Sequence, residues 1–135
     1  MHRRFPAWPL LAALVTSACA RKETVDPKDE IPIACALTAL DAEQRRREDV
    51  LLKEHLASIR EVKERVDGYS FRYPADIGLF ARMAELVALE HRCCPFLDFQ
   101  LEWSRTQDEP WLHVTGGARV KEFVIDTFVP ATAKR

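Results

Sequence analysis

The segment from Glu90 to Phe96 holds the residue types in this chain that are best suited to chemistry. It reads Glu-His-Arg-Cys-Cys-Pro-Phe, so a carboxylate, an imidazole and two thiols occur within five residues. A further thiol, Cys35, lies far upstream. Thiolates select soft ions such as Cu(I), Hg(II) or Zn(II), and a histidine or a carboxylate can complete the coordination. The sequence therefore predicts thiol or soft-metal chemistry.

We predict that Cys35, Cys93 and Cys94 are metal ligands and that Glu90 or His91 completes or tunes the site. His113, on a predicted strand, is a further candidate ligand. Adjacent alpha carbons lie about 3.8 Å apart, below the lower limit of about 4.4 Å for an ordinary disulfide. If the cysteines are oxidised, a disulfide from Cys35 to one of the paired cysteines is therefore easier to form than one between the pair, and the sequence does not say which.

Two other interpretations of the thiols stay open. In a thiol-dependent redox or nucleophilic enzyme, a protonated His91 or the neighbouring Arg92 would lower a thiol pKa, although the C-terminal end of a helix disfavours a thiolate. In a structural or interaction domain, the cysteines would be small buried side chains with one disulfide. We assign no catalytic residue and favour a non-enzymatic domain.

A helix is predicted to carry the paired cysteines. Asp76 can cap its beginning and Pro95 forces its end. The apolar residues of this helix repeat at three- and four-residue steps, and the same face extended arrives at Glu90, His91 and Cys94. The spacing thus directs a carboxylate, an imidazole and a thiol toward the interior.

The remaining elements predict an α+β domain. We expect a short edge strand over residues 31–37 that carries Cys35, and a long helix from Asp41 to about Val66 with His55 on its flank. Alternating apolar residues predict three more strands, and a short helix ends the domain; the ranges are 69–73, 97–103, 111–115 and about 120–128. Two main helices and the short C-terminal helix should pack on one face of a small mixed or antiparallel sheet.

The composition is that of one ordinary globular domain. The chain has 135 residues, of which 47% are hydrophobic and 30% charged, and its formal net charge is -1. This balance gives no basic surface for nucleic acid. We assign residues 31–128 to the domain and 129–135 to a tail.

The N-terminal residues predict export. Arg3 and Arg4 precede an apolar run that ends in small residues, which is typical of a signal peptide over residues 1–20. Ser17, Ala18 and Cys19 resemble a bacterial lipoprotein signal. A lipid on Cys19 would tether the domain to a membrane surface through a polar linker, residues 21–30. Cleavage after Ala20 would release a periplasmic or extracellular protein instead, and a mis-assigned start codon would leave a cytoplasmic one.

Several motifs together resemble a group of small uncharacterised bacterial proteins. They are Cys35-Ala36-Leu37 ahead of a charged helix, Asp67-Gly68-Tyr69, the run Glu90 to Phe96 with Phe99, and Thr115-Gly116, so the likeness covers about Ile31 to Phe128. Members carry a Glu-x-x-Cys-Cys-Pro-Phe motif and have no established activity. Some are associated with heavy-metal resistance, especially to mercury. The resemblance implies a domain with a thiol cluster.

Overall fold

The computed structural model of the chain describes residues 32–117 and 119–134. The chain divides into two units, Met1–Glu30 and Ile31–Arg135, and the fold described here is that of the second. The predicted signal peptide, its Cys19 and the linker lie outside the described residues. None of the helices in the described part is long and apolar enough to cross a membrane.

The described residues form an α+β domain, as predicted. Three α-helices, four strands and a short 3₁₀ helix follow one another in the order α1 (Ala42–Ser58), β1 (Glu61–Glu64), β2 (Gly68–Arg72), α2 (Ile77–Cys93), β3 (Asp98–Glu102), β4 (Trp111–Thr115), α3 (Val120–Phe128) and η1 (Ala131–Ala133).

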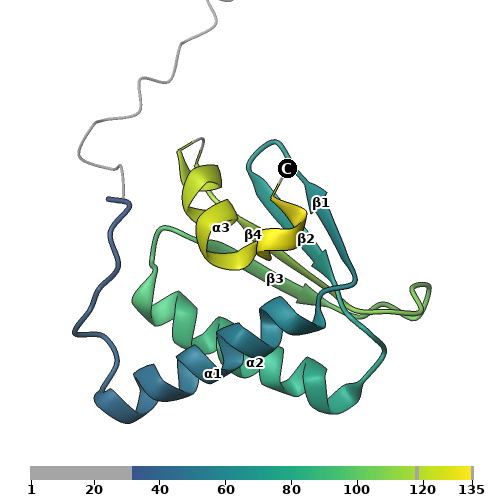
Figure 1. The fold of residues 1–135 in the computed structure, drawn as a ribbon, viewed down its shortest axis with the longest axis horizontal. Coiled ribbons are helices and arrows are strands. Elements are labelled where there is room, and N and C mark those ends of the chain that lie inside the picture. Colours follow the sequence, from purple (N-terminus) through teal and green to yellow (C-terminus); the bar gives the residue numbers. More distant parts are fainter. Residues whose placement is uncertain (1–31, 118, 135) are drawn as a thin grey trace, which may run out of the picture. The chain divides into compact units, whose positions relative to one another are not determined.

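The sheet is antiparallel throughout, with the strand order β1-β2-β4-β3 (Figure 1). Phe71 pairs with Leu112, and both are fully buried. Their neighbours Ser70 and His113 pair on the opposite face, because successive residues of a strand point to opposite sides. Gly68 lies so close to β4 that a Cβ would come 2.1 Å from the carbonyl oxygen of Val114. The sheet therefore has one apolar face and one polar face.

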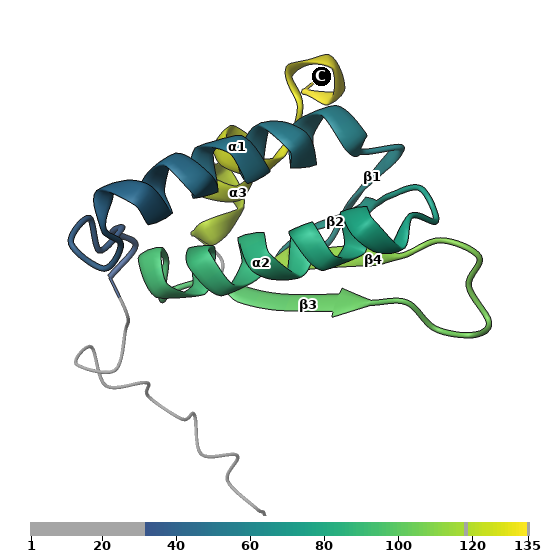
Figure 2. The same ribbon diagram turned by 90° about the horizontal axis from the view of Figure 1, so that it is seen from below.

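All three helices lie on the apolar side of the sheet (Figure 2). Helix α2 packs on β3, α3 packs on β2 and β4, and α1 packs on α2 and α3. The core between these layers is formed by the most buried apolar side chains, among them Leu51, Phe71, Tyr73, Met83, Leu86, Leu112, Val114, Val124 and Phe128.

Local signals set the ends of the two long helices. At the start of α1, Asp41 and Gln44 form a reciprocal capping box. At the start of α2, the Asp76 side chain accepts a hydrogen bond of 2.7 Å from the Leu79 backbone N–H. Helix α2 ends at Cys93, with Cys94 as its cap directly before Pro95. Both beginnings and the end of α2 agree with the sequence prediction.

The prediction that the first helix runs to about Val66 is wrong. Helix α1 ends at Ser58, and residues 61–64 form the edge strand β1. Val62 and Val66 continue the helical spacing by coincidence, whereas β-branched side chains fit a strand better. Val66 is 96% exposed beside the turn at Asp67-Gly68, and Arg65 N–H closes that turn on the Gly68 carbonyl. This turn joins β1 to β2 and does not terminate a helix.

The predicted strand over residues 31–37 is also absent from the described part of this segment, which begins at Pro32. Its backbone folds back on itself, since Ala34 N–H donates to Pro32 O and Leu37 N–H to Cys35 O. Ala36 N–H donates instead to the Cys93 carbonyl at the end of α2, at 2.7 Å. The last turn of a helix leaves carbonyl groups without intrahelical partners, and one of them accepts the hydrogen bond from Ala36 N–H that a sheet edge was expected to accept.

The predicted C-terminal tail is partly inside the fold. Val129 is 3% exposed and belongs to the core, and η1 follows it. The packed chain therefore continues past Phe128.

Candidate metal centre

Three cysteine sulfurs from two distant segments lie together. The Sγ atoms of Cys35, Cys93 and Cys94 are all within 4.8 Å of one another, and those of Cys35 and Cys94 are 3.2 Å apart. With Zn–S bonds of about 2.3 Å, sulfurs bound to one ion are separated by about 3.8 Å in tetrahedral and 4.0 Å in trigonal geometry. The observed spacing is compatible with these separations, so the three cysteines can bind a metal ion.

The loop that carries Cys35 is fixed to the end of α2. Besides the bond from Ala36 N–H to Cys93 O, the Arg92 guanidinium donates to the Ala39 carbonyl at 2.6 Å. The Arg45 guanidinium, from the first turns of α1, donates to the Leu37 carbonyl. These contacts fix the residues that directly follow Cys35 and so hold its thiol close to the end of α2.

The end of α2 lets the neighbouring thiols converge. Successive side chains on a regular helix point about 100° apart, which would separate the Cys93 and Cys94 sulfurs. Cys94 leaves the helical conformation, with φ -118° and ψ 73°, while its N–H still bonds to the Glu90 carbonyl at 2.6 Å. Pro95 disfavours helical geometry in the preceding residue, so the Cys-Cys-Pro order itself creates this turn.

Cys93 and Cys94 lie where ionisation of a thiol is disfavoured. Burial, with a smaller contribution from the Glu48 carboxylate, raises the pKa of Cys93 to about 11. Burial and the hydrogen bond with Cys35 raise the pKa of Cys94 well above its ordinary value. A metal ion that binds these sulfurs must therefore displace protons from them.

The structure separates the two polar residues that were predicted to accompany the thiols. Glu90 is 4% exposed, and its carboxylate has a side-chain hydrogen bond with Cys94. Burial, followed by the nearby Glu48 carboxylate, raises the pKa of Glu90 to about 7. His91 is exposed and is not part of the thiol group. The prediction that Glu90 and Cys94 share the buried face is confirmed, and for His91 it is wrong.

His113, the other candidate ligand, lies on the polar face of the sheet and outside the thiol group. Its Nδ1 is 2.7 Å from the Ser70 hydroxyl and its Nε2 is 3.4 Å from the Glu102 carboxylate. This alignment differs from the prediction of a metal ligand, and spacing along the chain does not reveal it because the three residues come from different strands. The alternation in each strand is the signal that could have placed them on one face.

His55 is a second polar residue whose position differs from the prediction. The sequence predicts it on the flank of the first helix, but it is fully buried. Its Nδ1 is 2.5 Å from the Tyr73 hydroxyl and its Nε2 is 2.8 Å from the Phe128 carbonyl. Burial lowers its pKa to about 4, so it is neutral at pH 7. Leu51, four residues earlier and also fully buried, gives the correct buried face of α1.

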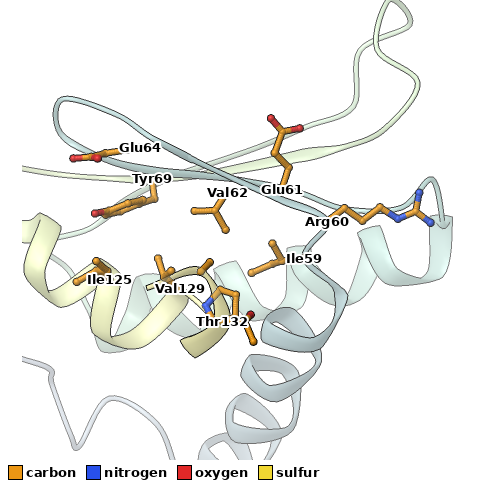
Figure 3. Close-up of a pocket in the computed structure, with 11 residues that line it drawn as sticks. Ile59, Arg60, Glu61, Val62, Glu64, Tyr69, Ile125, Val129 and Thr132 are labelled. Carbon is orange, nitrogen blue, oxygen red and sulfur yellow. The ribbon is translucent and has the colours of Figure 1, made fainter. Parts of the chain in front are cut away.

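A groove of about 380 Å³ lies elsewhere on the domain, between β1, the start of β2 and the segment that follows α3 (Figure 3). Ile59, Val62 and Ile125 supply apolar side chains to it. The charged residues at its rim are already paired, Arg60 with Glu109 and Glu61 with Arg72. It shares no residue with the thiol group, and its side chains give no reason to expect chemistry there.

Comparison of the chain with protein-family models, with curated proteins and with solved structures gives no match. A fold alone does not imply a function, so the function has to be argued from the geometry of a site. Within the described residues, the thiol group is the single cluster of three or more His, Cys, Asp or Glu side chains whose ligand atoms could hold a metal ion.

Proposed function

We propose that this domain binds and sequesters a soft metal ion, Hg(II), Cu(I) or Zn(II), through the thiolates of Cys35, Cys93 and Cys94. The observation that carries the proposal is the convergence of the three sulfurs within 4.8 Å. Thiolate ligands favour soft ions over hard ions such as Mg²⁺ and Ca²⁺.

The burial of the thiols also suits a binding site. Cys94 is 2% exposed, whereas Cys35 and Cys93 are partly exposed. An ion can therefore reach two sulfurs from solvent and then engage the third inside the domain. The Glu90 carboxyl group, hydrogen-bonded with Cys94, tunes this innermost ligand.

The raised pKa values of Cys93 and Cys94 suit metal ligands better than the nucleophile of a thiol enzyme. A reactive cysteine needs surroundings that stabilise its thiolate at neutral pH. Burial does the opposite for Cys93 and Cys94. A bound cation would supply the missing positive charge, because coordination deprotonates a thiol.

The sequence extends the proposal to the place where the domain acts. An export signal over residues 1–20 with a lipid on Cys19 would hold the thiol site at a membrane surface through the polar linker. The resemblance to bacterial proteins associated with mercury resistance agrees with interception of a toxic soft metal ion outside the cytoplasm.

Metal titration of the reduced protein tests the proposal. In a Cys19→Ser background, Hg(II), Cu(I) or Zn(II) is added in steps while free thiols are counted with a chromogenic reagent. We expect one ion per chain and the loss of all three thiols. Cys93→Ala and Cys94→Ala should each reduce metal uptake.

His91→Ala is the matched control, since this exposed neighbour lies outside the thiol group. It should keep the stoichiometry and affinity of the parent protein. Unchanged uptake in both cysteine variants would refute the proposal, provided that circular dichroism shows both to be folded.

A further inference from the structure

We propose that Cys35 and Cys94 also form a dithiol–disulfide couple that reduces low-molecular-weight disulfides, with Cys35 as the attacking thiol and Cys94 as the resolving thiol. The geometry points to this pair because their sulfurs are 3.2 Å apart. A disulfide requires about 2.05 Å between sulfurs, so the bond needs only a small closing movement.

The local backbone supports this pairing over the other two. A bond between Cys93 and Cys94 would need a distorted peptide, because adjacent alpha carbons are closer than normal disulfide geometry allows. The Cys35 loop is already hydrogen-bonded to α2 through Ala36 and Cys93 O. Cys94 turns its sulfur toward Cys35 where the helix ends. Cys93 is left as a third thiol that takes no part in the bridge.

Exposure assigns the two roles. Cys94 is 2% exposed and is out of reach of a dissolved disulfide, whereas Cys35 is partly exposed. The Cys35 thiolate attacks one sulfur of the substrate R–S–S–R, which forms a mixed disulfide and releases the first thiolate RS⁻. The Cys94 sulfur then attacks the Cys35 sulfur, closes the internal bond and releases the second RS⁻.

The overall reaction is balanced. Both cysteine thiols lose one proton and one electron, and the substrate disulfide gains two of each to become two R–SH. The second step is intramolecular between sulfurs that are already in contact, which is equivalent to a very high local thiol concentration. It therefore proceeds although burial disfavours the thiolate of Cys94.

Oxidation would also release a bound metal ion, and this consequence rests on the proposed function. The bridge removes two of the three thiolates and leaves Cys93 alone. The same three residues would then bind a soft metal ion when reduced and lose it when a disulfide oxidises them.

The test uses oxidised glutathione as the substrate and the full-length, reduced, metal-free protein. Every sample, including the one called wild-type, carries Cys19→Ser so that only Cys35, Cys93 and Cys94 can react. After alkylation of the remaining thiols and digestion with trypsin, mass spectrometry identifies the peptides joined to the one that contains Cys35. Cys93 and Cys94 fall in one tryptic peptide, because cleavage follows Arg92, so Cys93→Ala and Cys94→Ala distinguish them.

We expect the wild-type protein and Cys93→Ala to form the cross-link and to release two molecules of glutathione. Cys94→Ala should accumulate the mixed disulfide on Cys35. Closure of a bridge in this variant, which could use only Cys93, should be at least about tenfold slower than in Cys93→Ala. Closure that is equally fast in both variants, or a wild-type protein that forms no cross-link, would overturn the proposal.

Metal uptake is measured on the same samples before and after oxidation. Reduced protein that binds no ion but still forms the bridge would refute the proposed function and leave the couple intact. Bridged protein that binds as much metal as reduced protein would refute the competition between the two activities.

Discussion

The polar groups that lie near the two ends of helix α1 differ in how their hydrogen bonds are satisfied and in how far they are exposed. Toward its C-terminal end, His55 is fully buried and both ring nitrogens have partners, the Tyr73 hydroxyl and the Phe128 carbonyl. Near its N-terminal end, three thiols lie against one another, and two of them are partly exposed. In the first arrangement every polar atom has a partner, whereas the second brings together three sulfur atoms that can bind a metal ion.

The effect of burial on protonation also differs between His55 and the thiol group. Burial keeps His55 neutral, and its hydrogen bonds need no charge. Burial also raises the pKa values of Glu90, Cys93 and Cys94. Deprotonated sulfurs at this site would repel one another unless a cation joined them. The His55 network therefore stabilises the fold, whereas the convergence of three sulfurs indicates a metal site.

The largest effect is expected from His55→Ala. The substitution leaves a cavity in the core and removes the hydrogen-bond partners of the Tyr73 hydroxyl and the Phe128 carbonyl. We expect the free energy of unfolding to fall by about 3–5 kcal/mol, as measured by urea denaturation. Tyr73→Phe, which removes only one hydroxyl, should cost less. A loss below about 1 kcal/mol in His55→Ala would contradict the structural role of this network.

Acid should weaken the fold through the same residue. The pKa of His55 falls from 6.5 to about 4 on folding, so the unfolded chain takes up the proton first. The stabilisation is complete above pH 6.5 and is lost as the pH falls toward 4, by roughly 3 kcal/mol in total.

Denaturation at several pH values checks this in a Glu90→Gln background, which removes an overlapping titration. His55→Gln is the control. Glutamine does not titrate, so residue 55 should contribute no change in stability between pH 6.5 and pH 4. An equally steep loss in the control would assign the acid sensitivity to other groups.

Metal should stabilise the thiol end of the domain. With a free ion at one hundred times its dissociation constant, the reduced protein should gain about 2.7 kcal/mol against unfolding. Cys94→Ser should gain much less, whereas Tyr73→Phe should gain as much as the wild-type protein because it leaves the thiols intact. Equal stabilisation of Cys94→Ser would place the bound ion elsewhere.

The smallest effect is expected from Glu90→Gln and has the opposite pH dependence to that of His55. Burial raises the pKa of Glu90 from 4.5 to about 7, so this group favours folding most at low pH, and its contribution is lost as the pH rises from 4.5 through 7. At pH 8 the substitution removes a buried charge and should stabilise the protein by about 1–2 kcal/mol. At pH 4 it should change little. Destabilisation at pH 8 would show that the hydrogen bond with Cys94 outweighs the cost of burying the charge.

Local signals made part of the fold predictable. Asp76 and Pro95 mark the two ends of α2, and both act on the nearest backbone groups alone. The alternation in residues 97–103 and 111–115 likewise predicted the strands β3 and β4. The boundary between α1 and β1 was not predictable in this way, since the three- and four-residue spacing continues from Leu56 through Val62.

The burial of His55 could not be read from the amino-acid type. Histidine occurs both on surfaces and in cores, and Tyr73 and Phe128 come from distant parts of the chain. Only the packing of α1 on α2 and α3 decides which face of α1 is inside. The packing of α2 likewise leaves His91 exposed, although the preceding residue, Glu90, is buried.

By itself, the sequence determined the chemistry that is available: three thiols and a carboxylate, with Cys94 placed at the end of a helix by Pro95. The tertiary structure decided which of them meet. Cys35 and Cys94 are 59 residues apart, and they come together because the Cys35 loop takes its hydrogen-bond partner from the last turn of α2. That contact depends on where a helix end leaves unpaired carbonyls in space, and no spacing along the chain encodes it.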